Sequence, residues 1–499
     1  MALDATIDQH ARDFIAREHS MLIGGKWVPA ASGQTFETYD PSTGEVLATV
    51  PRGSSEDIDR AVKTARAAFD EDSPWRRMSP SERGRVIHRL GDLILENGDE
   101  LATLESLDNG KPLTIAKAAD IPLAADLFHY MSGWTTKSGG STLQISVPYM
   151  PGAEWHAYTL HDPVGVVGQI IPWNFPLLMA AWKLGPALAT GCCVVLKPAE
   201  QTPLSALRLG ELCLEAGIPP GVVNVVTGFG EETGAPLAAH PDVDKVAFTG
   251  STEVGRLILQ AAAGNLKKVS LELGGKSPNV VYADADLETA IPGAANAIFF
   301  NHGQCCAAGS RLFVEQSVYD EVVSGVADHA NSIQVGPGID PATQMGPLVS
   351  QEQLDRVCGF LASGETEGAE TVAGGKRRGD RGYFVEPTVL AGTNPKMKVE
   401  AEEIFGPVVT VRPFKDPSEL VGQANGTAFG LASGVWTSDL SKAHRTAKKL
   451  RAGTVWINCY NVFDAALPFG GYKESGWGRE MGAEALELYT EVKSVVTLL

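Results

Sequence analysis

Short apolar runs alternate with longer amphipathic stretches through the middle of the chain. The apolar runs cover residues 164–171, 192–196, 222–226, 246–249 and 269–273. Strands that are apolar on both faces and separated by helices are typical of a parallel sheet with helices on each side. The pattern therefore predicts an α/β fold with the architecture of dinucleotide-binding proteins.

A second alternating region runs from residue 286 to about 467 and predicts a separate α/β domain. Its expected strands are 311–314, 408–411, 434–436 and 454–457. Residues 140–161 and 489–499 instead alternate apolar and polar positions and have too little core of their own. We expect these two segments to pair with other subunits.

Helix boundaries are marked by local signals. Ser79, Pro80 and Glu82 form a capping box with proline in the first turn, which predicts a helix start.

Residues 177–196 are apolar and long enough to span a bilayer, but Lys183, a Gly-Pro pair and Gly191 interrupt them. We interpret this stretch as a buried helix, a glycine stop and a strand, so no membrane span is expected.

The composition and net charge of the chain limit the classes of protein to which it can belong. The chain has 499 residues, of which 44% are hydrophobic and 20% charged, as in a globular protein of two or three domains. Its net charge of -19 argues against a nucleic-acid partner. The seven cysteines lack CxxC spacing and include two adjacent pairs, so neither a metal site nor a disulfide framework is expected. Residues 1–8 lack a signal peptide, and a cytoplasmic location is predicted.

Candidate chemistry starts at the adjacent Cys305 and Cys306, which lie in a stretch of small residues between Gly303 and Gly309. A thiolate is a good nucleophile, and the glycines let the main chain approach a substrate. Taken alone, both thiols could equally be inert core residues.

Two further motifs supply groups that complement a nucleophile. Glu272 follows an apolar strand and precedes a glycine bend, where burial would raise its pKa towards that of a general base. Asn174 lies in a Pro-Trp-Asn-Phe-Pro turn, and its amide could donate to an oxyanion. Each alone has a structural alternative, as a strand-end carboxylate or as a rigid turn.

Phosphate-binding signals are present but irregular. The glycines at 228, 230 and 234 are spaced one residue too far apart for GxGxxG. Residues 248–255 are a better candidate, because a strand turns through Gly250 into a helix whose first N–H groups and Ser251 could hold a phosphate. The alternative is an ordinary capped helix.

Together these motifs resemble the NAD(P)-dependent aldehyde dehydrogenase superfamily from about Ile23 to Lys493. The cysteine signature falls on residues 303–311 and the glutamate signature on 271–278. The resemblance implies Cys306 as nucleophile, Glu272 as the base that activates water and Asn174 as oxyanion donor. It also matches Lys183 and Glu480 to a proton relay, although Lys183 could equally be a structural ion-pair partner.

The family fold implies three parts. Residues 1–139 and 162–272 would form a Rossmann-like NAD-binding domain, 273–472 an α/β catalytic domain, and 140–161 with 473–499 a small β oligomerisation arm. The arm implies a homotetramer or homodimer.

The resemblance also assigns cofactor and substrate positions. Glu200 would accept bonds from ribose hydroxyls and repel a 2′-phosphate, which favours NAD over NADP. The cofactor positions are Ile171, Pro172, Trp173, Lys197, Glu200, Gly230, Gly250, Ser251, Leu273, Glu403 and Phe405. The substrate positions are Phe175, Met179, Trp182, Cys305, Phe463 and Phe469.

The aromatic substrate positions suit an apolar or aryl aldehyde. Within the superfamily, residues 134–137, 152–158 and 465–471 look most like those of bacterial phenylacetaldehyde dehydrogenases. An aliphatic aldehyde or the cation of betaine aldehyde is an alternative. A CoA-acylating enzyme would need no water base, so Glu272 favours release of a free acid. A cysteine hydrolase using His302, four residues before Cys306, is an alternative of a different class.

Overall fold

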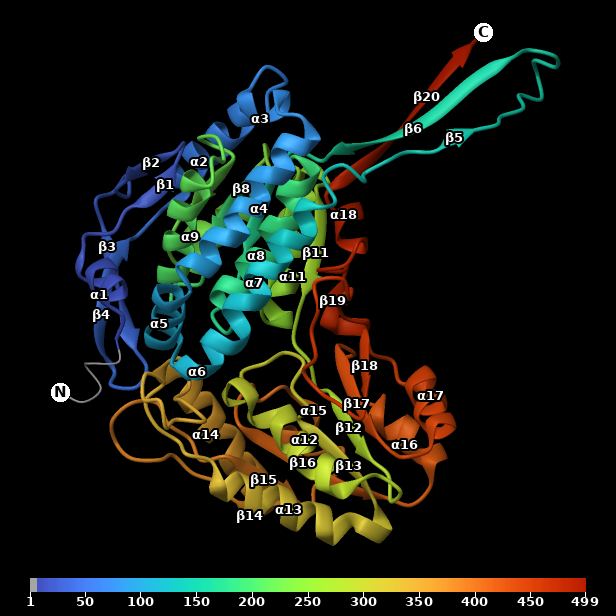
Figure 1. Ribbon diagram of the computed structural model, residues 1–499. Helices are drawn as coiled ribbons and strands as arrows, with labels where there is room; N and C mark the ends of the chain where they lie inside the picture. The colour runs from blue at the N-terminus through green and yellow to red at the C-terminus, as the bar shows by residue number, and fades with distance from the viewer. Residues whose placement is uncertain (1–6) are drawn as a thin grey trace.

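Two large β-sheets, each flanked by helices, form the body of the protein, and a β arm projects from it (Figure 1). The computed structural model describes residues 7–499. The prediction that no signal peptide is present rests largely on residues 1–6, which lie outside this range. The α/β class and the Rossmann-like parallel strands are confirmed.

The larger sheet is parallel at its centre and antiparallel at both edges. Strands β11, β10, β7, β8 and β9 run parallel, as the apolar runs predict. The edges differ, because β1 pairs antiparallel with both β9 and β2, and β19 pairs antiparallel with β11. The strand order is β19 (Gly476–Trp477), β11 (Lys268–Glu272), β10 (Lys245–Thr249), β7 (Val166–Ile170), β8 (Cys193–Lys197), β9 (Val223–Val225), β1 (Met21–Ile23) and β2 (Lys26–Val28).

The second sheet contains the four strands expected after residue 286 and three others. The order is β14 (Glu370–Ala373), β15 (Thr388–Ala391), β16 (Val408–Phe414), β13 (Arg311–Glu315), β12 (Pro278–Val281), β17 (Ala432–Trp436) and β18 (Thr454–Ile457). Only β14 is antiparallel to its neighbour. Strand β12 follows β11 after a short glycine turn, so the chain passes from one sheet to the other just after Glu272.

The arm is a three-stranded antiparallel sheet of β5 (Thr142–Leu143), β6 (Trp155–Pro163) and β20 (Thr490–Leu498). It extends away from both large sheets (Figure 1). The predicted boundary at residue 473 needs correction, because β19 belongs to the larger sheet. Of the C-terminal segment, the structure places β20 in the arm. A separate hairpin pairs β3 (Thr35–Asp40) with β4 (Glu45–Pro51).

Helices cover both sheets. They are α1 (Gln9–Ala16), α2 (Ser55–Ala68), α3 (Pro74–Arg77), α4 (Pro80–Glu96), α5 (Gly98–Asn109), α6 (Leu113–Ile115), α7 (Ile121–Ser132), α8 (Pro176–Thr190), α9 (Leu204–Glu215), α10 (Ala235–Ala239), α11 (Thr252–Ala262), α12 (Leu287–Phe299), α13 (Tyr319–Ser332), α14 (Gln351–Thr366), α15 (Lys398–Ala401), α16 (Pro417–Ala424), α17 (Leu440–Lys449) and α18 (Glu484–Glu487).

Two of the local predictions can be checked against helix ends. The capping box of Ser79 and Glu82 starts α4. Helix α8 is buried along its length and stops at Gly191, whose φ of 93° favours glycine. Among residues 7–499, no helix is both long enough and apolar enough to cross a membrane.

Candidate active site

The candidate cofactor residues follow one edge of the larger sheet. Ile171 follows β7, Lys197 ends β8, Gly230 follows β9, Gly250 follows β10 and Glu272 ends β11. These are the carboxyl ends of five consecutive parallel strands, where open α/β sheets bind their ligands. The strand order thus brings together residues that are up to about a hundred positions apart in the chain.

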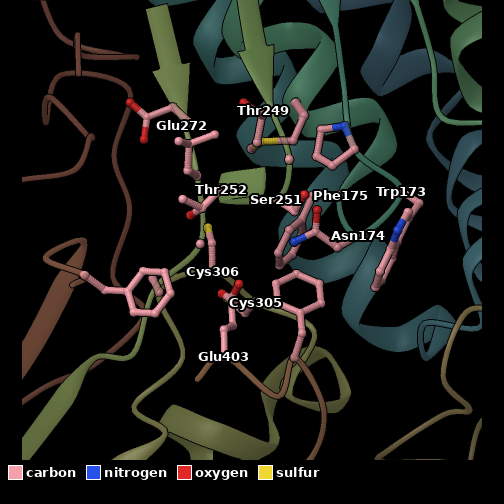
Figure 2. Close-up of a pocket in the computed structure, with 18 of the residues that line it drawn as sticks. Trp173, Asn174, Phe175, Thr249, Ser251, Thr252, Glu272, Cys305, Cys306 and Glu403 are labelled. Carbon is pink, nitrogen blue, oxygen red and sulfur yellow. The ribbon is translucent and has the colours of Figure 1, made fainter. Parts of the chain in front are cut away.

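A cavity of about 770 Å³ lies at this edge, between the two large sheets. Most of the predicted residues line it, and Figure 2 shows Glu272, Cys306, Asn174 and Glu403 around it. The lining includes Pro172, Trp173, Asn174, Phe175, Met179, Trp182, Gly250, Ser251, Glu272, Leu273, Cys305, Cys306, Glu403, Phe405, Phe463, Phe469 and Glu480. The predicted residues outside the lining are Ile171, Lys183, Lys197, Glu200 and Gly230.

A left-handed turn presents the candidate nucleophile. Helix α12 ends at Phe299, and Asn301, His302 and Gly303 then have φ values of 49°, 59° and 67°. A Cβ on Gly303 would lie 2.0 Å from the carbonyl oxygen of Gly406, so this position requires glycine. The turn directs the following residues, Cys305 and Cys306, towards the cavity.

The surroundings of the Cys306 thiol disfavour its ionised form. Interaction with the Cys305 thiol, burial and the carboxyl groups of Glu403 and Glu272 all raise the pKa of Cys306. Because the thiolate is the reactive form, we expect attack to require a proton acceptor or a compensating positive charge in the cavity.

Asn174 is held with its amide beside the cysteine turn. Its Nδ2 donates to the carbonyl oxygen of Gln304 at 3.0 Å, and Asn301 Nδ2 donates to the Asn174 carbonyl oxygen at 3.0 Å. An amide NH2 carries two hydrogens, so one remains to donate to an oxyanion. The sequence did not identify Asn301 and Gln304 as positioning residues, although Gln304 belongs to the cysteine motif and Asn301 lies two residues before it.

Glu272 is a buried carboxyl group at the end of β11, with 4% of its surface exposed. Burial and the negative charge of Glu480 raise its pKa. Among the described residues, no group donates a hydrogen bond to its Oε2. A Cβ on Gly470 would lie 2.7 Å from Glu272 Oε1, so the glycine leaves room for this carboxyl group.

Lys183 and Glu480 form a buried ion pair behind Glu272. Lys183 Nζ also donates to Thr249 Oγ1 at 2.6 Å. Glu480 lines the cavity and its backbone pairs with that of Phe469. The ion pair therefore connects helix α8 with the loop that carries one of the aromatic cavity residues.

Helix α11 begins at the cavity wall. Ser251 caps it by accepting from Val254 N at 3.2 Å, and residues 250–254 line the cavity. Free N–H groups at such a helix start favour a phosphate. These features fit a dinucleotide, with the Ser251 hydroxyl still able to donate its hydrogen.

Other candidate cofactor residues line the cavity or lie beyond it. Trp173 and Phe405 meet edge to face, with ring centroids 5.2 Å apart. Glu403 accepts from Gly275 N at 2.8 Å, and burial raises the pKa of Glu403 to about 7. Lys197 Nζ donates to Glu200 Oε2 at 2.9 Å beyond the cavity.

Gly230 fits its predicted role least well. It is exposed, and a Cβ there would meet no atom within 4 Å. The structure therefore shows no steric reason for glycine at this position.

An aromatic cluster closes one side of the cavity. Trp182 lies 5.3 Å from Phe469 and 6.1 Å from Phe463, and the two phenylalanines lie 5.7 Å apart, measured between ring centroids. Phe175 stacks at 6.1 Å on Phe300. The cavity also contains apolar residues that the motifs did not reveal, namely Leu123, Leu178, Phe300 and Phe429.

Comparison with known proteins gives the family. The model of the aldehyde dehydrogenase family matches residues 27–495. The chain belongs to the aldehyde dehydrogenase family. It is accordingly an aldehyde oxidoreductase, and its motifs occur in the expected order.

Individual relatives match over almost their whole length. A mitochondrial aldehyde dehydrogenase of Mesocricetus auratus is 54% identical over 96% of this chain and 94% of its own. A phenylacetaldehyde dehydrogenase of Pseudomonas fluorescens is 51% identical over 97% of both chains. The NAD+ complex of a Bacillus cereus aldehyde dehydrogenase is 52% identical over 99% of both chains, with a TM-score of 0.96.

The structure does not support His302 as the base of a cysteine hydrolase. His302 lies in the left-handed turn rather than on a helix running to Cys306. Its Nδ1 faces Gln304 Nε2 at 3.3 Å, and burial lowers the pKa of His302 to about 3. A ring held in this way supports the turn and has no hydrogen bond to the thiol.

Proposed function

We propose that this enzyme oxidises an apolar or aryl aldehyde, phenylacetaldehyde in the first place, to the carboxylic acid with NAD and water. One observation carries the proposal. Cys306, Asn174 and Glu272 line a single cavity together with the aromatic cluster and the start of helix α11. The cavity thus has a nucleophile, an oxyanion donor and a base beside apolar walls.

The proposed steps give each of these groups a role. After the Cys306 thiol has lost its proton to solvent, its sulfur bonds to the carbonyl carbon and the C=O π electrons move to the oxygen. Asn174 Nδ2 donates to the resulting oxyanion. NAD, when bound, would accept the hydride that the thiohemiacetal loses as it becomes a thioester. Glu272 then removes a proton from water, the water oxygen bonds to the acyl carbon, and the Cys306 sulfur leaves.

Cofactor binding would use the carboxyl edge of the larger sheet. We assign the pyrophosphate to Ser251 and the first turn of α11, and the adenosine ribose to Lys197 and Glu200. Trp173, Glu403 and Phe405 would flank the nicotinamide ribose. A carboxylate at Glu200 repels a 2′-phosphate, which supports NAD over NADP.

The choice of an aryl substrate rests on the aromatic cluster. Trp182, Phe463 and Phe469 offer ring edges and faces to a substrate ring. The relative from Pseudomonas fluorescens that bears the name phenylacetaldehyde dehydrogenase supports the same choice. Betaine aldehyde remains the alternative, since aromatic rings also attract a cation.

The catalytic assignment is tested with Glu272→Gln. Because the glutamine cannot accept a proton from water, we expect a burst of NADH of about one equivalent per active site, followed by slow turnover. Normal steady-state turnover would refute the role of Glu272. Hydrolysis of an ester without cofactor, and no aldehyde oxidation, would instead revive the hydrolase.

The substrate assignment needs a separate panel. We expect kcat/KM to be highest for phenylacetaldehyde among phenylacetaldehyde, hexanal and betaine aldehyde. Phe463→Leu should reduce kcat/KM for phenylacetaldehyde more than for hexanal, because it removes a ring–ring contact and keeps apolar volume. A preference of the wild type for hexanal or betaine aldehyde would reject the aryl assignment while leaving the catalytic steps intact.

The arm is the proposed oligomer interface. Strand β20 exposes Val492, Val496 and Leu498 at 63%, 55% and 55% of their surfaces. Apolar side chains on a projecting sheet favour pairing with another copy. We propose a homodimer or homotetramer, which light scattering of the purified protein would measure.

We also propose a cytoplasmic location, because the seven free thiols fit a reducing compartment.

A further inference from the structure

Two helices far from the active site bring two imidazoles and a carboxylate together. His88 and Asp92 lie on α4, and His129 lies on α7. Their ligand atoms all lie within 4.8 Å of one another. The side chains of His88, Asp92 and His129 are 55%, 40% and 24% exposed, so an ion can reach them from solvent.

The helices are arranged so that the three groups converge. His88 and Asp92 are four residues apart and share one face of α4. His129 Nε2 lies 3.0 Å from Asp92 Oδ1, and His88 Nε2 lies 3.9 Å from the same oxygen. A Cβ on Gly91 would lie 2.5 Å from the His129 ring, so glycine at this position lets the ring approach α4.

A serine orients the most exposed ligand. Ser132 Oγ donates to the His129 carbonyl oxygen at 2.6 Å and lies 3.4 Å from His88 Nδ1. Since the serine hydrogen is used, its oxygen accepts from Nδ1–H of His88. That tautomer leaves the lone pair of His88 Nε2 free, with Nε2 3.9 Å from Asp92 Oδ1. Metal-ligating histidines are likewise held by a hydrogen bond at their other ring nitrogen.

We propose that His88, Asp92 and His129 bind a divalent transition metal ion of the Zn2+, Ni2+ or Co2+ class. Two imidazoles and one carboxylate suit these ions, whereas Mg2+ and Ca2+ prefer oxygen ligands. Water would complete the coordination, because the three groups face solvent on one side.

The bound ion would clamp α4 to α7 and act on stability rather than on the chemical step. None of the three ligands lines the active-site cavity. Helix α7 packs in turn on α8, where a Cβ on Gly185 would lie 3.2 Å from Met131. The clamp therefore supports the helix that carries Trp182 and Lys183, without touching the substrate.

The test is a titration of the EDTA-treated full-length enzyme with Ni2+ by calorimetry and with Co2+ by absorption. We expect one ion per chain, a higher midpoint of thermal unfolding with the ion bound, and no effect of Mg2+. The Co2+ spectrum should lack thiolate charge-transfer bands, which would appear if the ion were bound by Cys305 and Cys306.

Variants identify the ligands. His88→Ala and the nearly isosteric Asp92→Asn should both abolish the Ni2+ isotherm, and Ser132→Ala should weaken it about tenfold. His444→Ala, at an exposed histidine on α17, is the matched control and should bind like the wild type. The proposal fails if the wild type does not bind Ni2+, or if His88→Ala and Asp92→Asn retain full affinity.

Discussion

The ammonium group of Lys183 and the carboxylate of Glu480 form an ion pair that is buried behind the candidate base Glu272. The two charges act on Glu272 in opposite directions. Glu480 raises the pKa of Glu272, whereas Lys183 lowers it. Burial is the main cause of the raised pKa of Glu272, and the two charges of the ion pair modify that pKa.

Glu480→Gln is expected to shift the pH profile of deacylation. The substitution removes the charge that raises the pKa of Glu272 and leaves the charge of Lys183, so the pKa falls. Because Glu272 accepts a proton only when ionised, the acid limb of the deacylation rate should move to lower pH. Single-turnover measurements across the pH range would show this shift, with the exposed Glu487→Gln as control. A shift to higher pH would contradict the electrostatic role.

The same substitution should reduce stability, because it leaves Lys183 buried without its counterion. Removing one partner of a buried pair costs about 3–5 kcal/mol, whereas a neutral replacement of both partners often costs little. We expect Glu480→Gln to lower the midpoint of thermal unfolding more than the double variant Lys183→Met/Glu480→Gln. An equal or larger loss in the double variant would show that the pair contributes a net stabilisation.

The central strands of both sheets were predictable because they are apolar on both faces. Strands such as β7, β8 and β10 are buried at every position. The edge strands of the larger sheet could not be predicted in this way, since β19 has two residues and β2 is largely exposed. Their positions depend on tertiary pairing, which a period of apolar residues does not encode.

Some active-site residues could likewise be predicted from the sequence, and others could not. Cys306, Glu272 and Asn174 follow from motifs in the sequence, and the cavity contains all three. The support from Asn301 and Gln304 was missed, because it arises from a left-handed turn that contacts a loop more than a hundred residues away. Only the folded chain brings these hydrogen bonds together.

Glu200→Gln is expected to relax the preference for NAD. The glutamine keeps the shape of the side chain but removes the charge that would repel a 2′-phosphate, and it frees Lys197 from its ion pair. Relief of one repulsive contact near the surface corresponds to about 1–2 kcal/mol, or roughly tenfold in kcat/KM with NADP. Steady-state kinetics with both cofactors measures the ratio, and Glu215→Gln on α9 serves as control. If kcat/KM with NADP does not rise in Glu200→Gln, residues other than Glu200 determine the cofactor preference.

Gly275→Ala should reduce activity by displacing the nucleophile. A Cβ on Gly275 would lie 2.1 Å from the carbonyl oxygen of Cys306, so either the cysteine turn or the loop between β11 and β12 must move. A displacement of about 1 Å at a reacting group can cost about a hundredfold in rate. We therefore expect kcat/KM to fall by that order, with the larger effect on kcat. Gly264→Ala, where a Cβ would meet no atom within 4 Å, is the matched control. Wild-type kinetics in Gly275→Ala would mean that the close approach of this loop to Cys306 is not needed for catalysis.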